Sequence, residues 1–209
     1  MQPVFGVNPV ILDDEGNELS GACQGRLAIK QAWPGIARTI YGDHARYLAT
    51  YIENGYYITG DGGKRDEQGD YWVTGRIDDV LNVSGHRLGT AEIESALLEH
   101  PAVSEAAVVG IEHAIKGQGI HAFVTLKASV TPEESLKKAL IQTVNQVIGP
   151  IAKPDIIQWA NALPKTRSGK IMRRLLRKIA NKDTDSLGDL STLANPESIA
   201  VLLANNDTR

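Results

Sequence analysis

The sequence predicts an α+β protein in which a β-rich stretch precedes a compact mixed domain. Short apolar runs separated by turn residues fill the first 77 positions. Beyond residue 78, amphipathic helical patterns alternate with apolar runs of strand length. Hydrophobic residues make up 42% of the 209 positions, which is enough for one large core or two small ones. We therefore expect a β-rich part at 1–77, an α+β domain at 78–180 and a polar tail at 181–209.

The first part is expected to be a sheet with one short helix. Acidic and glycine residues at 13–17 form a turn between its first two apolar runs. The expected elements, in order, are strands at 10–12 and 27–29, a helix over 43–53, and strands at 56–58 and 71–74.

The second part shows helix start signals between apolar runs. Thr90 is a candidate cap with acidic residues in the first turn after it, and this helix should stop at His100-Pro101. Thr131-Pro132 with Glu134 has the composition of a capping box. A basic amphipathic helix should open at Ser168 or Gly169. The expected strands are 103–109, 120–126 and 156–159, the last full helix ends near 180, and a short helix is possible from Pro196.

Composition excludes several classes of protein. The net charge of −3 gives no general reason to bind nucleic acid or an anionic membrane. A single cysteine, Cys23, excludes a disulfide framework and a cysteine-based zinc site within one chain. No run resembles a signal peptide or approaches the ~18 apolar residues of a membrane span. We expect a cytoplasmic protein.

A glycine-flanked aspartate follows the expected strand at 56–58. Asp61 lies between Gly60 and Gly62, and a carboxylate there can accept two hydrogen bonds from a vicinal diol such as that of ribose. The glycines would let a ligand approach the backbone. The alternative is an ordinary turn, because Asp and Gly are the commonest turn residues.

Two further segments offer anion-binding groups. Arg76 can meet a ribose or phosphate oxygen through its planar fork, or form a surface ion pair with Asp78 or Asp79. These aspartates lie where the composition changes, so they are also candidates for an interdomain hinge. The run 82–89, with small residues and an arginine before a helix start, is a candidate anion site or an ordinary loop.

A basic run at 163–174 contains Ser168-Gly169-Lys170. These three residues match the end of a phosphate-binding P-loop, but the rest of that motif fails, because position 164 is proline and position 171 is isoleucine. The arginines at 173, 174 and 177 are interpreted as the solvated face of a helix. Lys170 differs, since a neighbouring glycine would make its loop mobile. A mobile ammonium that can enter a cleft is a useful electrostatic catalyst for acyl and phosphoryl chemistry.

Together, and in this order, these segments resemble the C-terminal portion of the AMP-forming acetyl-CoA synthetases, which belong to the adenylate-forming superfamily. The matching segments are Thr59–Gly62, GRIDDVLNVSGHRLGT at 75–90, AEIESALLEHPAV at 91–103 and PKTRSGKIMRRLLRKIA at 164–180. The resemblance implies the β-rich end of a large N-terminal domain, followed by the small mobile C-terminal domain of these enzymes.

The resemblance also implies a two-step reaction. Acetate and ATP give acetyl-adenylate and pyrophosphate, and CoA then displaces AMP to give acetyl-CoA, with Mg²⁺ as the cofactor. The family's phosphate loop and acetate pocket have no counterpart in this sequence. We therefore expect a separate N-terminal adenylation domain upstream, and an isolated chain that cannot activate acetate.

Roles carry over to five positions at the nucleotide and the hinge. Asp61 matches the aspartate that holds the AMP ribose, Arg76 an arginine near the ribose and phosphate, and Arg87 an arginine that contacts the nucleotide. Lys170 matches the lysine that bridges the acetate carboxylate and the α-phosphate during adenylation, where its charge offsets the negative charge that accumulates. Asp78 falls at the hinge between the two poses of the mobile domain.

Three positions correspond to the family's CoA site, two of them with matching residues. Ser84 and Gly85 match the loop that lines the CoA channel. Asn145 is a departure, because relatives carry an arginine there that meets the CoA 3′-phosphate. Asparagine can hydrogen-bond but has no charge, so it lacks the ionic contact that the arginine makes with the CoA 3′-phosphate.

A magnesium site and a modification site are also implied. The metal would be held by the carbonyls of Leu98 and Val103 and by His100, although Mg²⁺ prefers oxygen ligands. The alternative for His100 is a histidine that stabilises the negative end of a helix. Lys170 matches a lysine that undergoes reversible acetylation, so an acetyltransferase and a deacetylase are possible partners.

Two other functions compete with the enzyme fragment. One is a free-standing module that binds a nucleotide or CoA, or is acetylated, without catalysis. The other is a nucleic-acid or membrane-surface binder that uses the basic residues of 165–178. The acidic balance of the whole chain argues against the second.

Overall fold

The computed structural model describes the whole chain except residues 184–186, 188–189 and 207–209. The chain forms two compact units, an N-terminal unit of Met1–Asp78 and a C-terminal unit of Asp79–Arg209. Each unit has its own sheet, and the predicted α+β class is confirmed. None of the helices in the described part of the chain has the length and apolar character that crossing a membrane requires.

The N-terminal unit is built around one long, glycine-rich strand, β4. Along one edge β4 pairs with β2, which pairs in turn with β1. At its other edge it pairs with β3 at one end and with β5 at the other. All of these pairings are antiparallel. The elements are β1 (Pro9–Leu12), β2 (Cys23–Ile29), α1 (His44–Tyr51), β3 (Ile52–Glu53), β4 (Tyr56–Arg65) and β5 (Tyr71–Arg76).

The sheet of the C-terminal unit is centred on the β8–β9 hairpin. β10 adds to β9 in parallel, and the β6–β7 hairpin joins β9 through a single pairing of Val83 with Gly117. The strands are β6 (Val80–Val83), β7 (His86–Gly89), β8 (Val103–His113), β9 (Gly117–Leu126) and β10 (Ile156–Trp159). The helices are α2 (Thr90–Leu98), α3 (Glu134–Val147), α4 (Arg173–Ala180) and α5 (Glu197–Asn206), with single 3₁₀ turns at Ile77–Asp79 (η1) and Pro150–Ala152 (η2).

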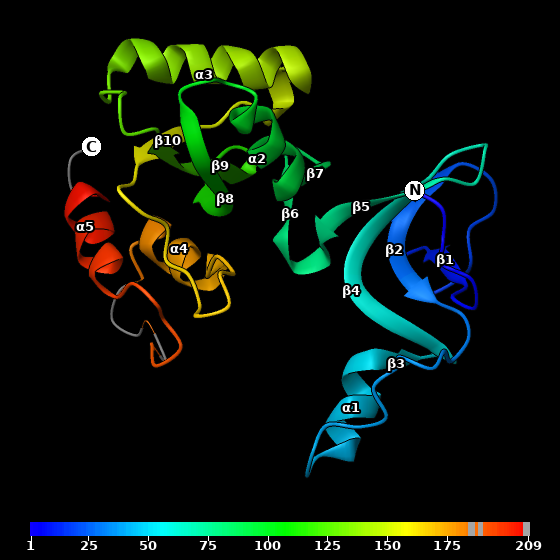
Figure 1. Cartoon of the computed structure of the whole chain (residues 1–209). Helices are drawn as coiled ribbons and strands as arrows, with labels where there is room; N and C mark the ends of the chain where they lie inside the picture. Colours follow the sequence, from blue (N-terminus) through cyan, green and yellow to red (C-terminus); the bar gives the residue numbers. More distant parts are fainter. Residues whose placement is uncertain (184–186, 188–189, 207–209) are drawn as a thin grey trace. The chain divides into compact units, whose positions relative to one another are not determined.

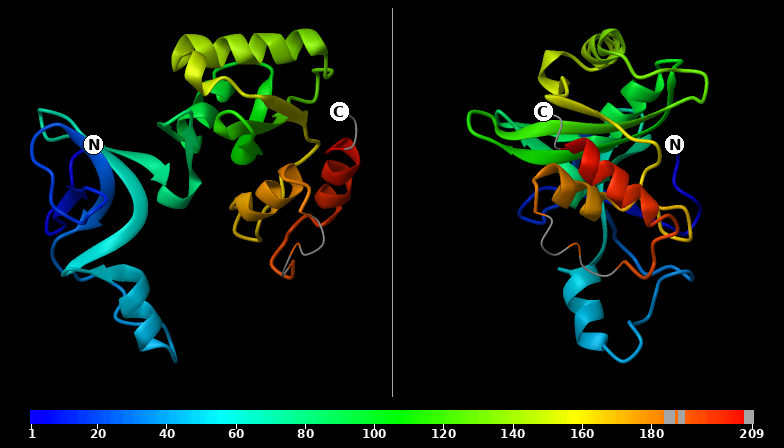
Figure 2. Two further views of the ribbon diagram at one scale, coloured as in Figure 1. Left: turned by 180° about the vertical axis from the view of Figure 1, so that it is seen from behind. Right: turned by 90° about the vertical axis from the view of Figure 1, so that its left-hand side faces the viewer.

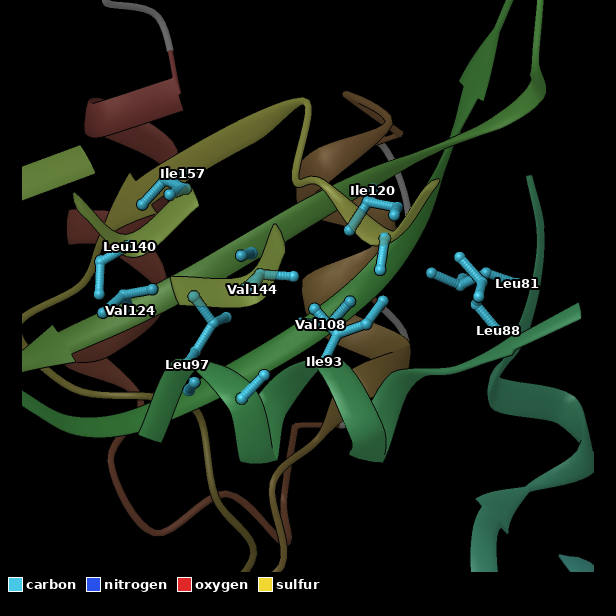
Figure 3. Packing of buried hydrophobic residues seen from close by; sticks show 14 of the residues in the cluster. Leu81, Leu88, Ile93, Leu97, Val108, Ile120, Val124, Leu140, Val144 and Ile157 are labelled. Atoms are coloured by element: carbon cyan, nitrogen blue, oxygen red, sulfur yellow. The ribbon is translucent and has the colours of Figure 1, made fainter. Parts of the chain in front are cut away.

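Two helical layers cover the two faces of this sheet (Figures 1 and 2). On one face, α2 and α3 pack on β8, β9 and β10, and Figure 3 shows the side chains that meet there. On the other face, α4 and α5 pack on β8 and β9, and α5 also contacts β10. Residues of β8 alternate between the two cores, with Ala106 and Val108 facing α2 and α3, and Ala107 and Val109 facing α4 and α5.

Four local expectations differ from the structure. β4 does not stop before its glycines but continues through them to Arg65. The expected loop at 82–89 is largely a hairpin of two strands. α4 begins at Arg173, not at Ser168 or Gly169. Neither expected threonine caps a helix, because the caps of α2 and α3 are Gly89 and Glu133, without side-chain hydrogen bonds.

The segment expected to be a polar tail is packed on the C-terminal unit where the structure describes it. Leu193, Ile199 and Leu202 are buried in the core beneath α4. α5 begins at Glu197, directly after Pro196, as the proline predicts.

Candidate functional site

In the N-terminal unit, β4 and β5 place Asp61 and Arg76 opposite each other. The two positions pair in the sheet, and Arg76 Nη1 lies 3.8 Å from Asp61 Oδ1. Arg76 Nε also donates to Asp78 Oδ1 at 3.2 Å. The Arg76 side chain is 55% exposed and that of Asp61 33% exposed, so this pairing is worth at most about 1 kcal/mol. Both charged groups can therefore turn to a ligand at little cost.

The glycines around Asp61 are required by close packing. Gly60 has a φ of +78°, and a side chain there would meet the Arg76 guanidinium at 3.0 Å. A side chain at Gly62 would approach the Thr74 hydroxyl to 2.6 Å. The Thr59 hydroxyl donates to the Leu27 carbonyl and accepts from the Asp61 amide, which fixes the backbone beside the carboxylate. The motif thus forms a rigid strand with Arg76 lying over its glycine, rather than a simple turn.

Asp78, the expected hinge, is the last residue of the N-terminal unit. On its N-terminal side, Arg76 ends strand β5. On its C-terminal side, the Asp79 carboxylate accepts a 2.9 Å hydrogen bond from Arg177 Nη2 in α4. Asp78 itself lies within the 3₁₀ turn η1 at the boundary between the two units. The hinge role itself stays a prediction.

Ser84 and Gly85 form the turn of the β6–β7 hairpin. Both have positive φ, at +52° and +83°, which is the geometry of a two-residue hairpin turn. The Ser84 amide donates to the Lys116 carbonyl at 3.0 Å. Both residues are exposed, and Arg87 is exposed in β7 while its neighbour Leu88 is buried. The sequence signal for this hairpin was the turn dipeptide Ser84-Gly85 between two short runs that contain apolar residues.

Lys170 lies on an ordered turn between β10 and α4. The Thr166 amide donates to the Lys170 carbonyl at 2.8 Å, and the Gly169 amide donates to the Thr166 carbonyl at 2.8 Å. The Thr166 hydroxyl accepts from the Lys170 amide at 3.1 Å, and Gly169 has a φ of +84°. A β-bridge between Lys165 and Ile171 closes the base of the turn. The exposed side chain of Lys170 is therefore presented from a closed turn and not from the first turn of a helix.

The interpretation of Arg173 as a solvated residue is wrong, and Arg177, whose side chain is 43% exposed, is also held by an ion pair. Arg173 meets the buried carboxylate of Glu94 through two hydrogen bonds, of 3.1 and 2.7 Å, and Arg177 binds Asp79. Burial lowers the pKa of Arg173, but the hydrogen bonds and charge of Glu94, with the charge of Asp79, outweigh it and raise the pKa. Arg174 is exposed, as expected. The missed signal was Glu94 itself, a charged residue among the buried positions of α2.

The expected metal ligands surround the C-terminal end of α2. Leu98 is the last residue of that helix, where carbonyls lack helical partners. The His100 carbonyl accepts from the Val103 amide at 3.0 Å, and His100 Nδ1 accepts from the Ala102 amide at 3.3 Å. An imidazole nitrogen is a poor ligand for Mg²⁺, and the described residues contain no cluster of three His, Cys, Asp or Glu that could hold a metal. These groups therefore fit Mg²⁺ only in part.

Asn145 lies in the last turn of α3, with its side chain exposed. It therefore occupies a different element from the β6–β7 hairpin and from the Lys170 turn. The structure brings together Asp61, Arg76 and Asp78 in one unit, and Ser84, Gly85 and Arg87 in one hairpin of the other.

Comparisons with known proteins agree on one group of enzymes. Residues 92–170 match the family model of the AMP-binding enzyme C-terminal domain. The acetyl-coenzyme A synthetases of Alkalilimnicola ehrlichii and Saccharophagus degradans are each 61% identical to this chain over 209 residues, 99% of its length. The match spans 32% of either protein, so the chain corresponds to about a third of the curated relatives.

Solved structures of related enzymes share the fold. The anthranilate CoA ligase AuaEII, solved with anthranoyl-AMP, is 30% identical with a TM-score of 0.79, covering 88% of this chain and 35% of the enzyme. ATP-bound MatB from Rhodopseudomonas palustris is 26% identical with a TM-score of 0.71, covering 83% of this chain and 34% of MatB. Residues 92–170 thus resemble the AMP-binding enzyme C-terminal domain, and the whole chain is similar to the acetyl-coenzyme A synthetases, of which it spans about a third.

Proposed function

We propose that this chain is the C-terminal part of an acetate–CoA ligase that makes acetyl-CoA from acetate, ATP and CoA and releases AMP and pyrophosphate. The observation that carries the proposal is the 61% identity to acetyl-coenzyme A synthetases over 99% of the chain. The structure adds support, since the candidate residues occupy exposed or half-exposed positions on well-defined strands and turns.

In the proposed enzyme, Asp61 and Arg76 bind the nucleotide. The Asp61 carboxylate accepts hydrogen bonds from the ribose diol, and Arg76 exchanges its weak pairing with Asp61 and Asp78 for a ribose or phosphate oxygen. The exposed Arg87 adds a second guanidinium on the other unit. Binding costs little, because the ion pairs that it replaces are exposed to solvent.

Lys170 serves the adenylation step. An acetate oxygen attacks the α-phosphorus of ATP, the bond to the β-phosphate breaks and pyrophosphate leaves. Two anions approach each other in this step, so an ammonium placed between the carboxylate and the α-phosphate lowers the barrier. A lysine offers three donors on a flexible stem, which suits contact with both groups.

The β6–β7 turn serves the second step. The CoA sulfur attacks the acyl carbon of acetyl-adenylate, the bond from that carbon to the phosphate oxygen breaks, and AMP leaves as the thiol gives up its proton. Ser84 and Gly85 offer exposed backbone and a small side chain beside the path of the pantetheine. Asp78, at the boundary between the two units, is the proposed hinge residue for the change between the two steps.

Three finer points belong to this proposal. Mg²⁺ enters with ATP, whose phosphate charge it neutralises, and the end of α2 is a second and weaker candidate for it. Acetylation of Lys170 by an acetyltransferase would remove the ammonium charge and stop adenylation, and a deacetylase would restore it. The location is the cytoplasm, where ATP and CoA are at hand and a lone cysteine such as Cys23 stays reduced.

The test is a chimera in which this chain replaces the matching third of the Alkalilimnicola ehrlichii enzyme. We expect the chimera to catalyse acetate-dependent exchange of pyrophosphate into ATP and to form acetyl-CoA. The chain alone and the truncated relative should do neither. Lys170→Ala, or acetyl-lysine at 170, should slow the exchange by at least about 100-fold, yet leave acetyl-CoA formation from supplied acetyl-adenylate intact.

A folded chimera without exchange activity would contradict the proposal. Pyrophosphate exchange by the isolated chain would also contradict the proposal, because it would show that the activity needs no upstream domain. Tight binding of AMP or CoA by the chain alone, together with an inactive chimera, would instead favour a free-standing binding module.

A further inference from the structure

The segment 192–195 runs beside the turn that carries Lys170. The Ala194 amide donates to the Lys165 carbonyl at 2.8 Å, and the Arg167 amide donates to the Thr192 carbonyl at 3.2 Å. Between these two bonds, Thr166 and Leu193 form an antiparallel β-bridge. The N-terminal leg of the Lys170 turn therefore has a strand partner from the part of the chain that lies beyond α4.

The side chain of Asn195 extends this pairing by one more step. Its Oδ1 accepts from the Lys165 amide at 3.0 Å, and its Nδ2 donates to the Leu163 carbonyl at 2.9 Å. A primary amide offers a donor and an acceptor side by side, as a peptide group does, so Asn195 satisfies two backbone groups of the leg at once. We call this pair of bonds the Asn195 clasp.

The clasp is fixed to the core of the C-terminal unit. Leu193, Ile199 and Leu202 are buried against the α4 side of the sheet. The Ser198 hydroxyl donates to the Asn195 carbonyl at 2.7 Å, at the start of α5. Gln158 Nε2 in β10 donates to the Leu202 carbonyl at 2.8 Å. The segment thus holds the turn from a rigid base.

The other leg of the turn depends on the same base. The Met172 amide donates to the Pro164 carbonyl at 2.8 Å, and the Thr166 amide donates to the Lys170 carbonyl. The carbonyl of Lys170 is thus bonded to a residue that is itself paired with Leu193. If the clasped leg shifted, Thr166 would move with it, and the hydrogen bond from the Thr166 amide to the Lys170 carbonyl would displace the backbone of Lys170.

We propose that Asn195 is a positioning residue for Lys170, and that the segment 192–195 sets where the lysine ammonium lies during adenylation. The inference rests on the proposed function for its catalytic part. The contacts that carry it are independent of that function. A misplacement of the order of 1 Å at a reacting group can cost about 100-fold in rate, so a loosened turn has a measurable effect.

The first experiment uses the chimera with Asn195→Ala, which removes both bonds of the clasp, and Asn195→Asp, which keeps the acceptor for the Lys165 amide but loses the donor to Leu163. Asn161→Ala is the matched control, since Asn161 is an exposed asparagine two positions before the clasped leg. We expect Asn195→Ala to lower kcat of pyrophosphate exchange by about 10- to 100-fold with unchanged KM for acetate and ATP. The kcat of Asn195→Asp should lie between that of Asn195→Ala and that of the Asn161→Ala control.

The half-reactions separate positioning from a general loss of structure. Acetyl-CoA formation from supplied acetyl-adenylate does not need Lys170, so it should stay within about twofold of the parent in every variant. An equal loss in both half-reactions, or no loss in exchange, would overturn the proposal.

A second measurement needs no catalysis. In the 209-residue chain, Asn195→Ala should speed trypsin cleavage after Arg167 and Lys170 and the hydrogen exchange of the Lys165 amide, and Asn161→Ala should change neither. If the parent chimera lacks exchange activity, the proposed function fails and the catalytic role of Asn195 fails with it. If the chimera is active but Asn195→Ala changes neither trypsin cleavage nor hydrogen exchange of the Lys165 amide, the positioning role of Asn195 is overturned and the proposed function stands.

Discussion

Arg173, the first residue of α4, forms a two-pronged ion pair with Glu94 in α2, with Nε–Oε1 at 3.1 Å and Nη2–Oε2 at 2.7 Å. The side chains are 28% and 10% exposed. Glu94 Oε1 also accepts the Val108 amide of β8 at 2.8 Å. The ion pair therefore joins α2 on one face of the sheet and α4 on the other to strand β8. Arg173 lies only three residues after Lys170 in the chain.

Arg173→Ala should destabilise the C-terminal unit by about 3 kcal/mol, because it leaves the buried carboxylate of Glu94 without its cation. Urea unfolding of the 209-residue chain measures this change. Arg174→Ala, on the exposed side of the same helix, is the control and should change stability by no more than about 0.5 kcal/mol. Equal effects of the two substitutions would show that the ion pair adds nothing.

Gly60→Ala should weaken nucleotide binding as well as stability. The positive φ of Gly60 strains any other residue, at a cost of about 1 kcal/mol, and the added methyl group would displace the Arg76 guanidinium. Gly69→Ala isolates the strain, since Gly69 has a φ of +81° but open space around it. Both variants should unfold at lower urea concentration, but only Gly60→Ala should raise the KM for ATP in the chimera.

Asn145→Arg should improve the use of CoA by the chimera. A guanidinium at this exposed position of α3 would supply the positive charge that a 3′-phosphate attracts, and a solvent-exposed pair of this kind is worth up to about 1 kcal/mol, or roughly fivefold in KM. The KM for 3′-dephospho-CoA should not change. Gln146→Arg adds the same charge at the next position of the helix and serves as the control; an equal gain from it would contradict a specific contact.

The N-terminal unit should lose stability in acid through Glu53. Arg26 donates to both oxygens of this carboxylate, at 2.9 and 2.5 Å, and these hydrogen bonds hold the pKa of Glu53 below its ordinary value of 4.5. The folded state thus binds this proton less readily than the unfolded state. The stabilisation is complete above pH 4.5 and is lost as the pH falls through the lower folded value.

Urea unfolding between pH 7 and pH 3 tests this dependence. Because Glu53 is 39% exposed, the effect is no more than about 1 kcal/mol. Glu53→Gln should reduce the difference between the two pH values, whereas Glu67→Gln, at an exposed turn of the same sheet, should not. Parallel behaviour of the two variants would rule out the Arg26 pair as the cause.

The sequence predicted local features better than contacts between distant residues. The apolar period of α4 placed Leu175 and Ile179 in the core, and the structure confirms it. The solvated interpretation missed the ion pairs of Arg173 and Arg177, because their partners lie 79 and 98 residues earlier in the chain. No local pattern reports such a pairing.

The Lys170 turn shows the same division. Gly169 and the basic residues marked the segment as functional, yet they also fitted a helix that starts too early. The turn is defined by Thr166 and by its pairing with Leu193 and Asn195, and Asn195 lies 30 residues away from Lys165. A segment that looks like a polar tail in sequence therefore becomes part of the site only through tertiary contacts.

The alternation of β8 between two cores restricts how this unit can diverge. Successive residues from Ala106 to Val109 face opposite helical layers. Substitutions of similar size at these positions alter one layer at a time and leave the other intact. Insertion or deletion of a single residue would instead turn the following side chains of β8 to the opposite face of the sheet, which disrupts both cores at once. Among descendants of this domain, the amino acids of β8 are therefore free to drift within limits of volume, whereas the length of the strand is not.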